Sequence, residues 1–81
     1  MEITVLAFGI AKDIFGGQLI TVELGDSTAT TADLKVSLEA RYPKLKQLAS
    51  YMVAVNNEYA EDGGVITELD EVAIIPPVSG G

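Results

Sequence analysis

The residues of this chain that could do chemistry lie at its end, in the stretch Pro-Pro-Val-Ser-Gly-Gly (76–81). Two prolines favour an extended, semi-rigid backbone that holds a tail away from a folded domain. Gly80 and Gly81 have no Cβ, so they could enter a channel too narrow for other residues. Two terminal glycines arise by chance about 0.5% of the time, since glycine makes up about 7% of average sequence. We therefore interpret residues 76–81 as an extended tail that presents one reactive group, the carboxylate of Gly81.

A carboxylate is a poor electrophile, so the predicted chemistry needs activation. ATP could convert the Gly81 carboxylate into an acyl-adenylate, which a nucleophile would then attack. The chain has no Cys and no His, which excludes a disulfide, a thiolate zinc site, a Ser-His-Asp triad and the commonest general base. The acid pairs Glu61-Asp62 and Asp70-Glu71 lie in turn-like sequence without EF-hand spacing, so we interpret them as solvated turns and predict no metal site.

Length and charge limit the class of protein. Eighty-one residues suffice for one domain. Twelve acidic and five basic residues give a net charge of −7, which argues against binding to nucleic acid or to an anionic membrane and favours a basic protein partner. The first residues lack the basic region of a signal peptide, and no stretch reaches the ~20 apolar residues of a membrane span. We therefore expect a cytoplasmic protein.

Hydrophobic periodicity predicts the elements that must position the tail. Apolar and β-branched runs predict strands at 2–8, 18–24, 51–57, 65–67 and 71–76, and polar residues predict a loop at 25–31. Leu34 and Leu38 lie at helical spacing within residues 31–42, with Val36 beside them, and Thr30 and Asp33 form a capping-box pattern. One amphipathic helix must cover a sheet face to bury its stripe.

The predicted order, β-β-α-β-(β)-β, indicates an α+β fold. We expect a β-grasp domain over residues 1–75, with a mixed sheet and one main helix packed on one face. The first and last strands are the most apolar, so we place them side by side in the middle. Residues 76–81 form the predicted tail.

Strand alternation also predicts an exposed apolar surface. Phe8 and Ile75, and Leu6 with them, fall on sheet faces opposite the expected core residues Val5 and Ile74. Tyr59, in the hairpin arm after the turn at 56–57, could join them. An apolar patch rimmed by acids on a small protein is typical of a protein interface.

The chain resembles the small subunit of molybdopterin synthase, a ubiquitin-like sulfur carrier. The matching stretches are VLAFG (5–9), VAVN (53–56) and above all DEVAIIPPVSGG (70–81). The resemblance implies a ubiquitin-like β-grasp whose terminal glycine, here Gly81, is adenylated and converted to a thiocarboxylate. It also implies that Gly80, with Ser79 and Val78, enters the active site of the large catalytic subunit, where sulfur passes to a cyclic pyranopterin monophosphate in molybdenum cofactor biosynthesis.

The same resemblance implies partners and contact residues. Phe8, Tyr59 and Ile75 fall where the family has apolar interface residues. The implied partners are an ATP-dependent adenylating activating enzyme and the large subunit, in an assembly of two small and two large subunits. The chain itself is expected to bind no cofactor and to act as a sulfur donor rather than as an enzyme alone.

Two departures from the family pattern affect these expectations. The family commonly has Gly in the turn before the last strand, where this chain has Leu69, so a position that needs positive φ would be strained. Ala7 and Ile75 stand where bulky aromatic residues are common, which bears on the strength of partner contact.

Three alternative functions stay open. The chain could be a related carrier that donates sulfur to thiamine, tRNA, cysteine or tungsten-pterin synthesis. It could be a ubiquitin-like modifier that forms isopeptide bonds to lysines. It could also be an interaction domain with an inert tail, whose activity would survive loss of Gly80 and Gly81.

Overall fold

The computed structural model describes residues 1–25, 29–48 and 50–76. The predicted tail residues Val78, Ser79, Gly80 and Gly81 lie outside the described residues. The elements in chain order are β1 (Glu2–Ala7), α1 (Ile10–Phe15), β2 (Leu19–Glu23), β3 (Ala29–Thr30), α2 (Thr31–Arg41), the 3₁₀ helix η1 (Pro43–Gln47), β4 (Met52–Val55), β5 (Glu58–Tyr59), β6 (Val65–Ile66) and β7 (Val72–Ile75).

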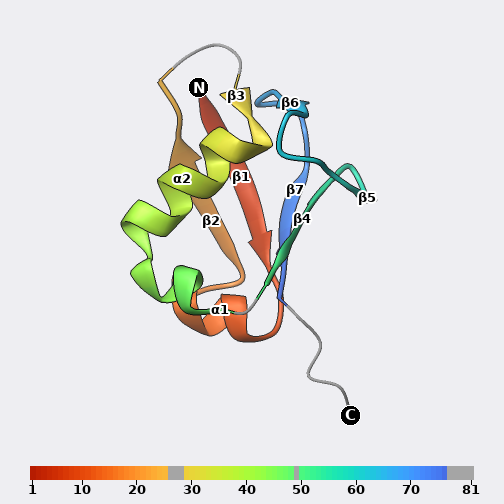
Figure 1. Ribbon diagram of the computed structural model, residues 1–81. Helices are drawn as coiled ribbons and strands as arrows, with labels where there is room; N and C mark the ends of the chain where they lie inside the picture. The colour runs from red at the N-terminus through yellow and green to blue at the C-terminus, as the bar shows by residue number, and fades with distance from the viewer. Residues whose placement is uncertain (26–28, 49, 77–81) are drawn as a thin grey trace.

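The main sheet has five strands in the order β2-β1-β7-β4-β5. The first and last strands, β1 and β7, lie side by side in the middle and run parallel, with Val5 opposite Val72 and Ala7 opposite Ile74. The other neighbours are antiparallel, so the sheet is mixed. Figure 1 shows α2 lying across one face of this sheet. The predicted β-grasp, with its central pair of strands, is confirmed.

A second, two-stranded sheet was not expected. Residues 25–31 read as a polar loop, but Ala29–Thr30 forms β3 and pairs antiparallel with Val65–Ile66. Two residues are too short to show an alternating pattern, and their partner lies more than 30 positions away in the sequence. This small sheet ties the start of α2 to the long loop before β7 (Figure 1).

The core lies between α2 and the covered face of the sheet. Fully buried side chains come from the strands (Ile3, Val5, Val53, Val72 and Ile74), from α2 (Leu34 and Leu38) and from η1 (Leu45). The predicted helical stripe of Leu34 and Leu38 is therefore confirmed. Val36, placed beside that stripe from sequence, is 70% exposed. The prediction was wrong because residue 36 lies two positions from each leucine, about 200° around the helix.

The predicted capping box at the start of α2 is confirmed. The backbone N–H of Asp33 donates to Thr30 Oγ1 (3.2 Å), and the backbone N–H of Thr30 donates to Asp33 Oδ2 (3.0 Å). These two bonds satisfy donors that the first helical turn leaves unpaired. In the part of the chain that the structure describes, no helix is long and apolar enough to cross a membrane.

The turn before β7 differs from the one expected. Among the described residues other than glycine, positive φ occurs only at Asn56 (53°) and Asn57 (70°), in the β4–β5 hairpin. Leu69 therefore does not occupy a left-handed conformation, and the strain expected there is absent. The backbone N–H of Asp70 donates to the carbonyl of Thr67 (3.0 Å), so this turn closes without the glycine that the family pattern suggested.

Candidate functional site

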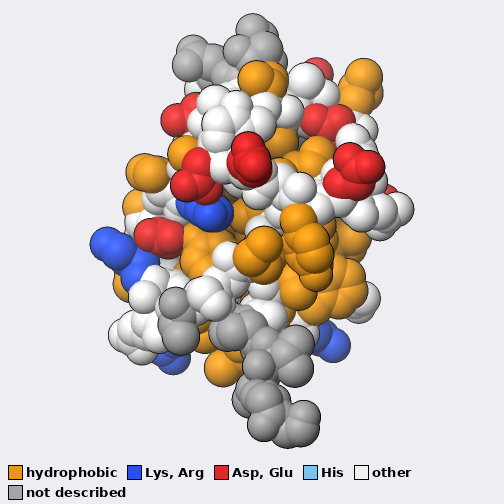
Figure 2. Space-filling view, turned by 45° about the vertical axis from the view of Figure 1, so that its right-hand side comes forward, with side chains coloured by type: hydrophobic (Ala, Val, Ile, Leu, Met, Phe, Trp, Pro, Cys, Tyr) orange, Lys and Arg blue, Asp and Glu red, His pale blue; other side chains and the backbone are white. Residues whose placement is uncertain are grey.

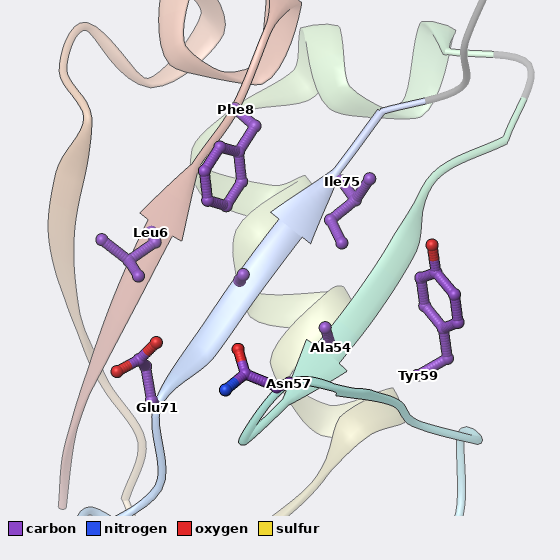
Figure 3. A pocket seen from close by; sticks show the side chains of 8 residues that line it. Leu6, Phe8, Ala54, Asn57, Tyr59, Glu71 and Ile75 are labelled. Atoms are coloured by element: carbon purple, nitrogen blue, oxygen red, sulfur yellow. The ribbon is translucent and has the colours of Figure 1, made fainter.

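Three residues predicted at a partner interface come together on the sheet face opposite α2. Phe8, Tyr59 and Ile75 line one hollow of about 290 Å³. The side chain of Phe8 is 47% exposed, that of Tyr59 is 67% exposed, and Ile75 is partly buried. Figure 3 shows these side chains over the strands, with α2 on the far side of the sheet. We call this hollow the open-face surface; its lining is completed by Leu6, Ala54, Asn57, Glu71 and Ala73.

Strand register explains why these residues share one face. Leu6 lies opposite Ala73 across the parallel β1–β7 pair, and Ala73 lies opposite Ala54 across the antiparallel β7–β4 pair. Ala54 in turn lies opposite Tyr59 in the β4–β5 hairpin. Residues directly opposite each other point to the same side of a sheet. The hollow forms because the two alanines are small and stand between larger side chains at its borders.

The hairpin that carries Tyr59 follows from its turn chemistry. Asn56 and Asn57 both have positive φ, the conformation of a two-residue type I′ turn, which asparagine tolerates better than most residues. A two-residue turn fixes the register of β4 against β5. Tyr59 is therefore held on the open face rather than on the face that α2 covers.

Ala7 does not belong to the open-face surface. Its side chain is 1% exposed and points into the core, in register with Ile74. The sequence-based suggestion that a small residue here affects partner contact is therefore wrong, because alternation along β1 puts Ala7 and Phe8 on opposite sides. Ile75 is the departure from the family pattern that lies at the surface.

The open-face surface has an acidic border and no basic residue. Glu71 lines the hollow, and its backbone N–H donates to Asn56 Oδ1 (2.9 Å). The five basic residues of the chain all lie in helical segments: Lys12 in α1, Lys35 and Arg41 in α2, and Lys44 and Lys46 in η1. Figure 2 shows acidic side chains gathered over the upper half of one view, with hydrophobic ones below them toward the right.

Asp70 lies in the turn beside this acidic border and stabilises that turn through hydrogen bonds. Its carboxylate accepts hydrogen bonds from the backbone N–H of Thr67 (2.8 Å) and from Asn56 Nδ2 (2.9 Å). These bonds, the one from Thr67 first, hold the pKa of Asp70 below its usual range. Asp70 therefore stays ionised and joins the β4–β5 hairpin to the turn before β7. Both acid pairs were predicted to lie in solvated turns. The turn at Asp70-Glu71 is, in addition, held by hydrogen bonds.

The start of the tail lies beside this surface. Ile75 ends β7 and is followed by Pro76, the first residue of the tail and the last that the structure describes. Gly9 directly follows Phe8 with φ 56° and ψ −132°, and a Cβ at this glycine would lie 3.2 Å from Pro76 Cγ. Only glycine fits both this backbone conformation and this close approach. The chain therefore leaves the domain next to Phe8 and Ile75.

Sequence reasoning missed several members of the surface. Leu6 was predicted from alternation along β1, but Ala54 and Asn57 in the hollow and Met52 beside it needed the strand register, which the sequence does not show. Met52 lies opposite Ile75 and is 46% exposed, so it extends the apolar area past the hollow. Among the described residues no group of three or more His, Cys, Asp or Glu side chains is placed to hold a metal ion.

Comparisons with known proteins show which family the chain belongs to. A model of the ThiS family matches residues 5–81. The molybdopterin synthase sulfur carrier subunit of Chlamydomonas reinhardtii is 42% identical over 84 residues, covering all of both chains. That of Arabidopsis thaliana is 38% identical over 82 residues, covering all of this chain and 84% of the relative.

Solved structures show the same fold. The crystal structure of SAMP1 from Haloferax volcanii superposes with a TM-score of 0.84 at 27% identity, over all of both chains. A protein–protein complex of subunits 1 and 2 of molybdopterin-converting factor from Helicobacter pylori contains a chain that matches with a TM-score of 0.69 at 20% identity, again over all of both chains, which is a likeness of fold alone. The family predicted from residues 5–9, 53–56 and 70–81 is thus confirmed. The chain belongs to the ThiS family and, within it, is similar to the molybdopterin synthase sulfur carrier subunits.

Proposed function

We propose that this protein is the sulfur-carrier subunit of a molybdopterin synthase, acting in the cytoplasm. The observation that carries the proposal is the junction of two features. An exposed apolar surface lies at Phe8, Tyr59 and Ile75, and the chain leaves the domain beside it at Pro76 toward Gly81. A partner that covers the surface would receive the tail in its own active site.

The proposed chemistry takes place at the carboxylate of Gly81. Its oxygen attacks the α-phosphorus of ATP on an activating enzyme, pyrophosphate leaves, and an acyl-adenylate forms. Sulfur at the sulfide level attacks the acyl carbon, the bond from that carbon to the AMP oxygen breaks, and AMP leaves to give the thiocarboxylate. In the synthase this sulfur bonds to a carbon of the cyclic pyranopterin monophosphate in place of an oxygen substituent, which leaves, and water then cleaves the acyl–sulfur bond and restores the carboxylate. Two such transfers supply the two sulfurs of a dithiolene.

The chain's own contribution is docking and presentation. No side chain on the open-face surface has the His or Cys chemistry that would move sulfur, since the whole chain lacks both residue types. Docking converts the meeting of two reactants into a reaction within one complex. The large subunit supplies the groups that bind and polarise the pterin. Narrow access around the tail would explain the use of Gly80, which has no side chain to exclude.

Two protein partners follow from this proposal. One is the large subunit, in an assembly of two small and two large chains; a complex of subunits 1 and 2 is known for the related fold from Helicobacter pylori. The other is the ATP-dependent activating enzyme. Both would use the same exposed apolar surface and the same tail, so their binding to this chain would be mutually exclusive.

A protein modifier is the alternative with a specific observation in its favour. The fold superposes on a small archaeal modifier protein, SAMP1, at 27% identity. In that case the activated Gly81 would form an isopeptide bond to a lysine of another protein. Higher-mass conjugates that disappear when Gly81 is deleted would support this function, and their absence together with pterin synthesis would support the sulfur carrier.

The decisive experiment reconstitutes synthesis from purified chain, large subunit, activating enzyme, ATP and a sulfur donor. Deletion of Gly81, or addition of one residue after it, is expected to abolish formation of molybdopterin and to leave the melting temperature unchanged. A matched control, Val36→Ser, alters an exposed side chain on α2 and should be fully active. Molybdopterin formation by a chain that lacks Gly81 would contradict the proposal.

A further inference from the structure

A second hollow lies on the same side of the sheet, at the other end of β1 from Phe8. It measures about 300 Å³, and it shares Leu6 and Glu71 with the open-face surface. Its remaining lining comes from Thr4 on β1, Leu19 on β2 and residues 68–70 of the turn before β7. The two hollows are therefore adjacent, and one partner can cover both. We call the second one the Leu69 hollow.

Leu69 is exposed to an unusual degree for a large apolar side chain. It is 93% exposed, and Leu19 across the hollow is 58% exposed. Neither leucine is needed to fill the core, which the buried residues of the sheet and α2 already form. Two exposed leucines and the partly buried Leu6 thus make an apolar area that folding does not explain.

The turn that carries Leu69 is held in place by hydrogen bonds. The backbone N–H of Leu69 donates to Thr67 Oγ1 (3.3 Å), and the backbone N–H of Asp70 donates to the carbonyl of Thr67 (3.0 Å). The carboxylate of Asp70 accepts from Thr67 and Asn56, as described above. These bonds hold the backbone of the turn, so binding through Leu69 would order little additional backbone, which favours its use as an anchor.

The charges around the Leu69 hollow define the chemistry of its partner. Glu68, Asp70 and Glu71 line it, and no basic residue does. Neither Glu68 nor Glu71 forms an ion pair with any described residue, and every Lys and Arg of the chain lies in a helical segment. A complementary surface must therefore bring Lys or Arg to these two carboxylates and an apolar side chain to Leu69.

We propose that the Leu69 hollow is a second docking point for the large subunit, which inserts an apolar side chain against Leu69 and Leu19 and places a basic side chain against Glu68 and Glu71. This inference rests on the proposed function, because the occupant is the partner that covers the adjoining open-face surface. Contact at both hollows fixes the rotation of the domain on its partner.

The test is the affinity of the full-length chain for the purified large subunit, measured by titration calorimetry at low and at physiological salt. Leu69→Ser should weaken binding about tenfold or more, because an exposed leucine loses its burial in the complex. Val36→Ser, the matched change on α2, should bind as the unaltered chain does. Circular dichroism melts should show both variants folded, since both side chains are exposed in the free protein.

Charge reversal tests the chemistry of the partner. Glu68→Lys should lower affinity at least tenfold at low salt, with a smaller loss at high salt, because screening weakens exposed charge pairs. Glu61→Lys makes the same change outside the hollow and should have little effect. Tighter binding by Glu68→Lys would overturn the assignment of a basic partner surface.

The outcomes separate this inference from the proposed function. If Phe8→Asp abolishes binding while Leu69→Ser and Glu68→Lys bind normally, the Leu69 hollow is no contact and the sulfur-carrier proposal stands. If the unaltered chain fails to bind the large subunit at all, both proposals are overturned. Loss of affinity in the Leu69 and Glu68 variants, with normal binding of both controls, supports the second docking point.

Discussion

Replacement of Phe8 by aspartate is the most informative change on the open-face surface. Phe8 is 47% exposed in the free protein, so about half of its surface stays available for a partner to bury. Complete burial of a phenylalanine side chain contributes about 1.5–3 kcal/mol. The half that docking would bury is therefore worth about 0.7–1.4 kcal/mol, or roughly three- to tenfold in affinity.

An aspartate at this position adds a second penalty. Its carboxylate would be removed from water in the complex and would stand on a surface that already carries Glu71. Burial of an unpaired charge costs several kcal/mol in protein environments. We therefore expect Phe8→Asp to weaken binding to the large subunit at least a hundredfold, and Phe8→Ala only about three- to tenfold.

Calorimetric titration with the large subunit measures the loss, and thermal melts measure the fold. Because part of Phe8 packs on the free domain, Phe8→Asp should lower the melting temperature by about 5–10 °C, the shift that 1–1.5 kcal/mol gives in a domain of this size. Val36→Asp places the same charge on α2 and should bind normally. Normal affinity of Phe8→Asp would refute the docking argument, and complete unfolding would show that Phe8 belongs to the core.

Three further predictions concern the described domain, each read from thermal melts. Thr30→Ala removes the cap bond from Asp33 and should lower the free energy of unfolding by about 1 kcal/mol and the melting temperature by about 4–8 °C. Thr30→Ser keeps the hydroxyl and should melt as the unaltered chain does. Equal melting temperatures of the two variants would contradict the cap. Asp70 has a lowered pKa, so its stabilisation is present above the ordinary pKa of about 4 and is lost as pH falls through the folded value. Asp70→Asn should reduce this loss of stability at acid pH. An unchanged loss would exclude the hydrogen bonds of the turn as its source. Burial and then the 2.5 Å bond to Glu39 raise the pKa of Tyr51, so stability should fall as pH rises above about 10, and Tyr51→Phe should remove that alkaline loss.

Local sequence patterns predicted most of the fold because the interactions behind them join residues that are close together in the sequence. Thr30 and Asp33 satisfy donors within one helical turn, and the asparagines at 56–57 adopt the positive φ that a tight hairpin needs. The apolar character of β1 and β7 placed them in the middle of the sheet, since central strands are covered by neighbours on both edges. These features depend on residues close together in the sequence or on the composition of a whole strand.

The parts of the fold that the sequence did not predict depend on pairing between residues far apart in the chain. Strand β3 forms only because β6 meets it, and neither has enough residues for a periodic pattern. The floor of the open-face surface depends on the register of four strands, and a shift of one residue would turn Ala54 to the other face. Leu69 could be recognised as a departure from the family pattern, but its exposure beside Leu19 appears only when the turn is placed against β2.

The central claim, that sulfur is carried on Gly81, is tested most directly by mass spectrometry. The intact protein is purified from cells that contain a competent activating enzyme and sulfur donor, and the fragment that bears Gly81 is sequenced. The account predicts replacement of one terminal oxygen by sulfur, located on Gly81 and lost after incubation with the large subunit and the pterin substrate. An unmodified carboxylate in those cells, or sulfur at any other residue, would contradict it.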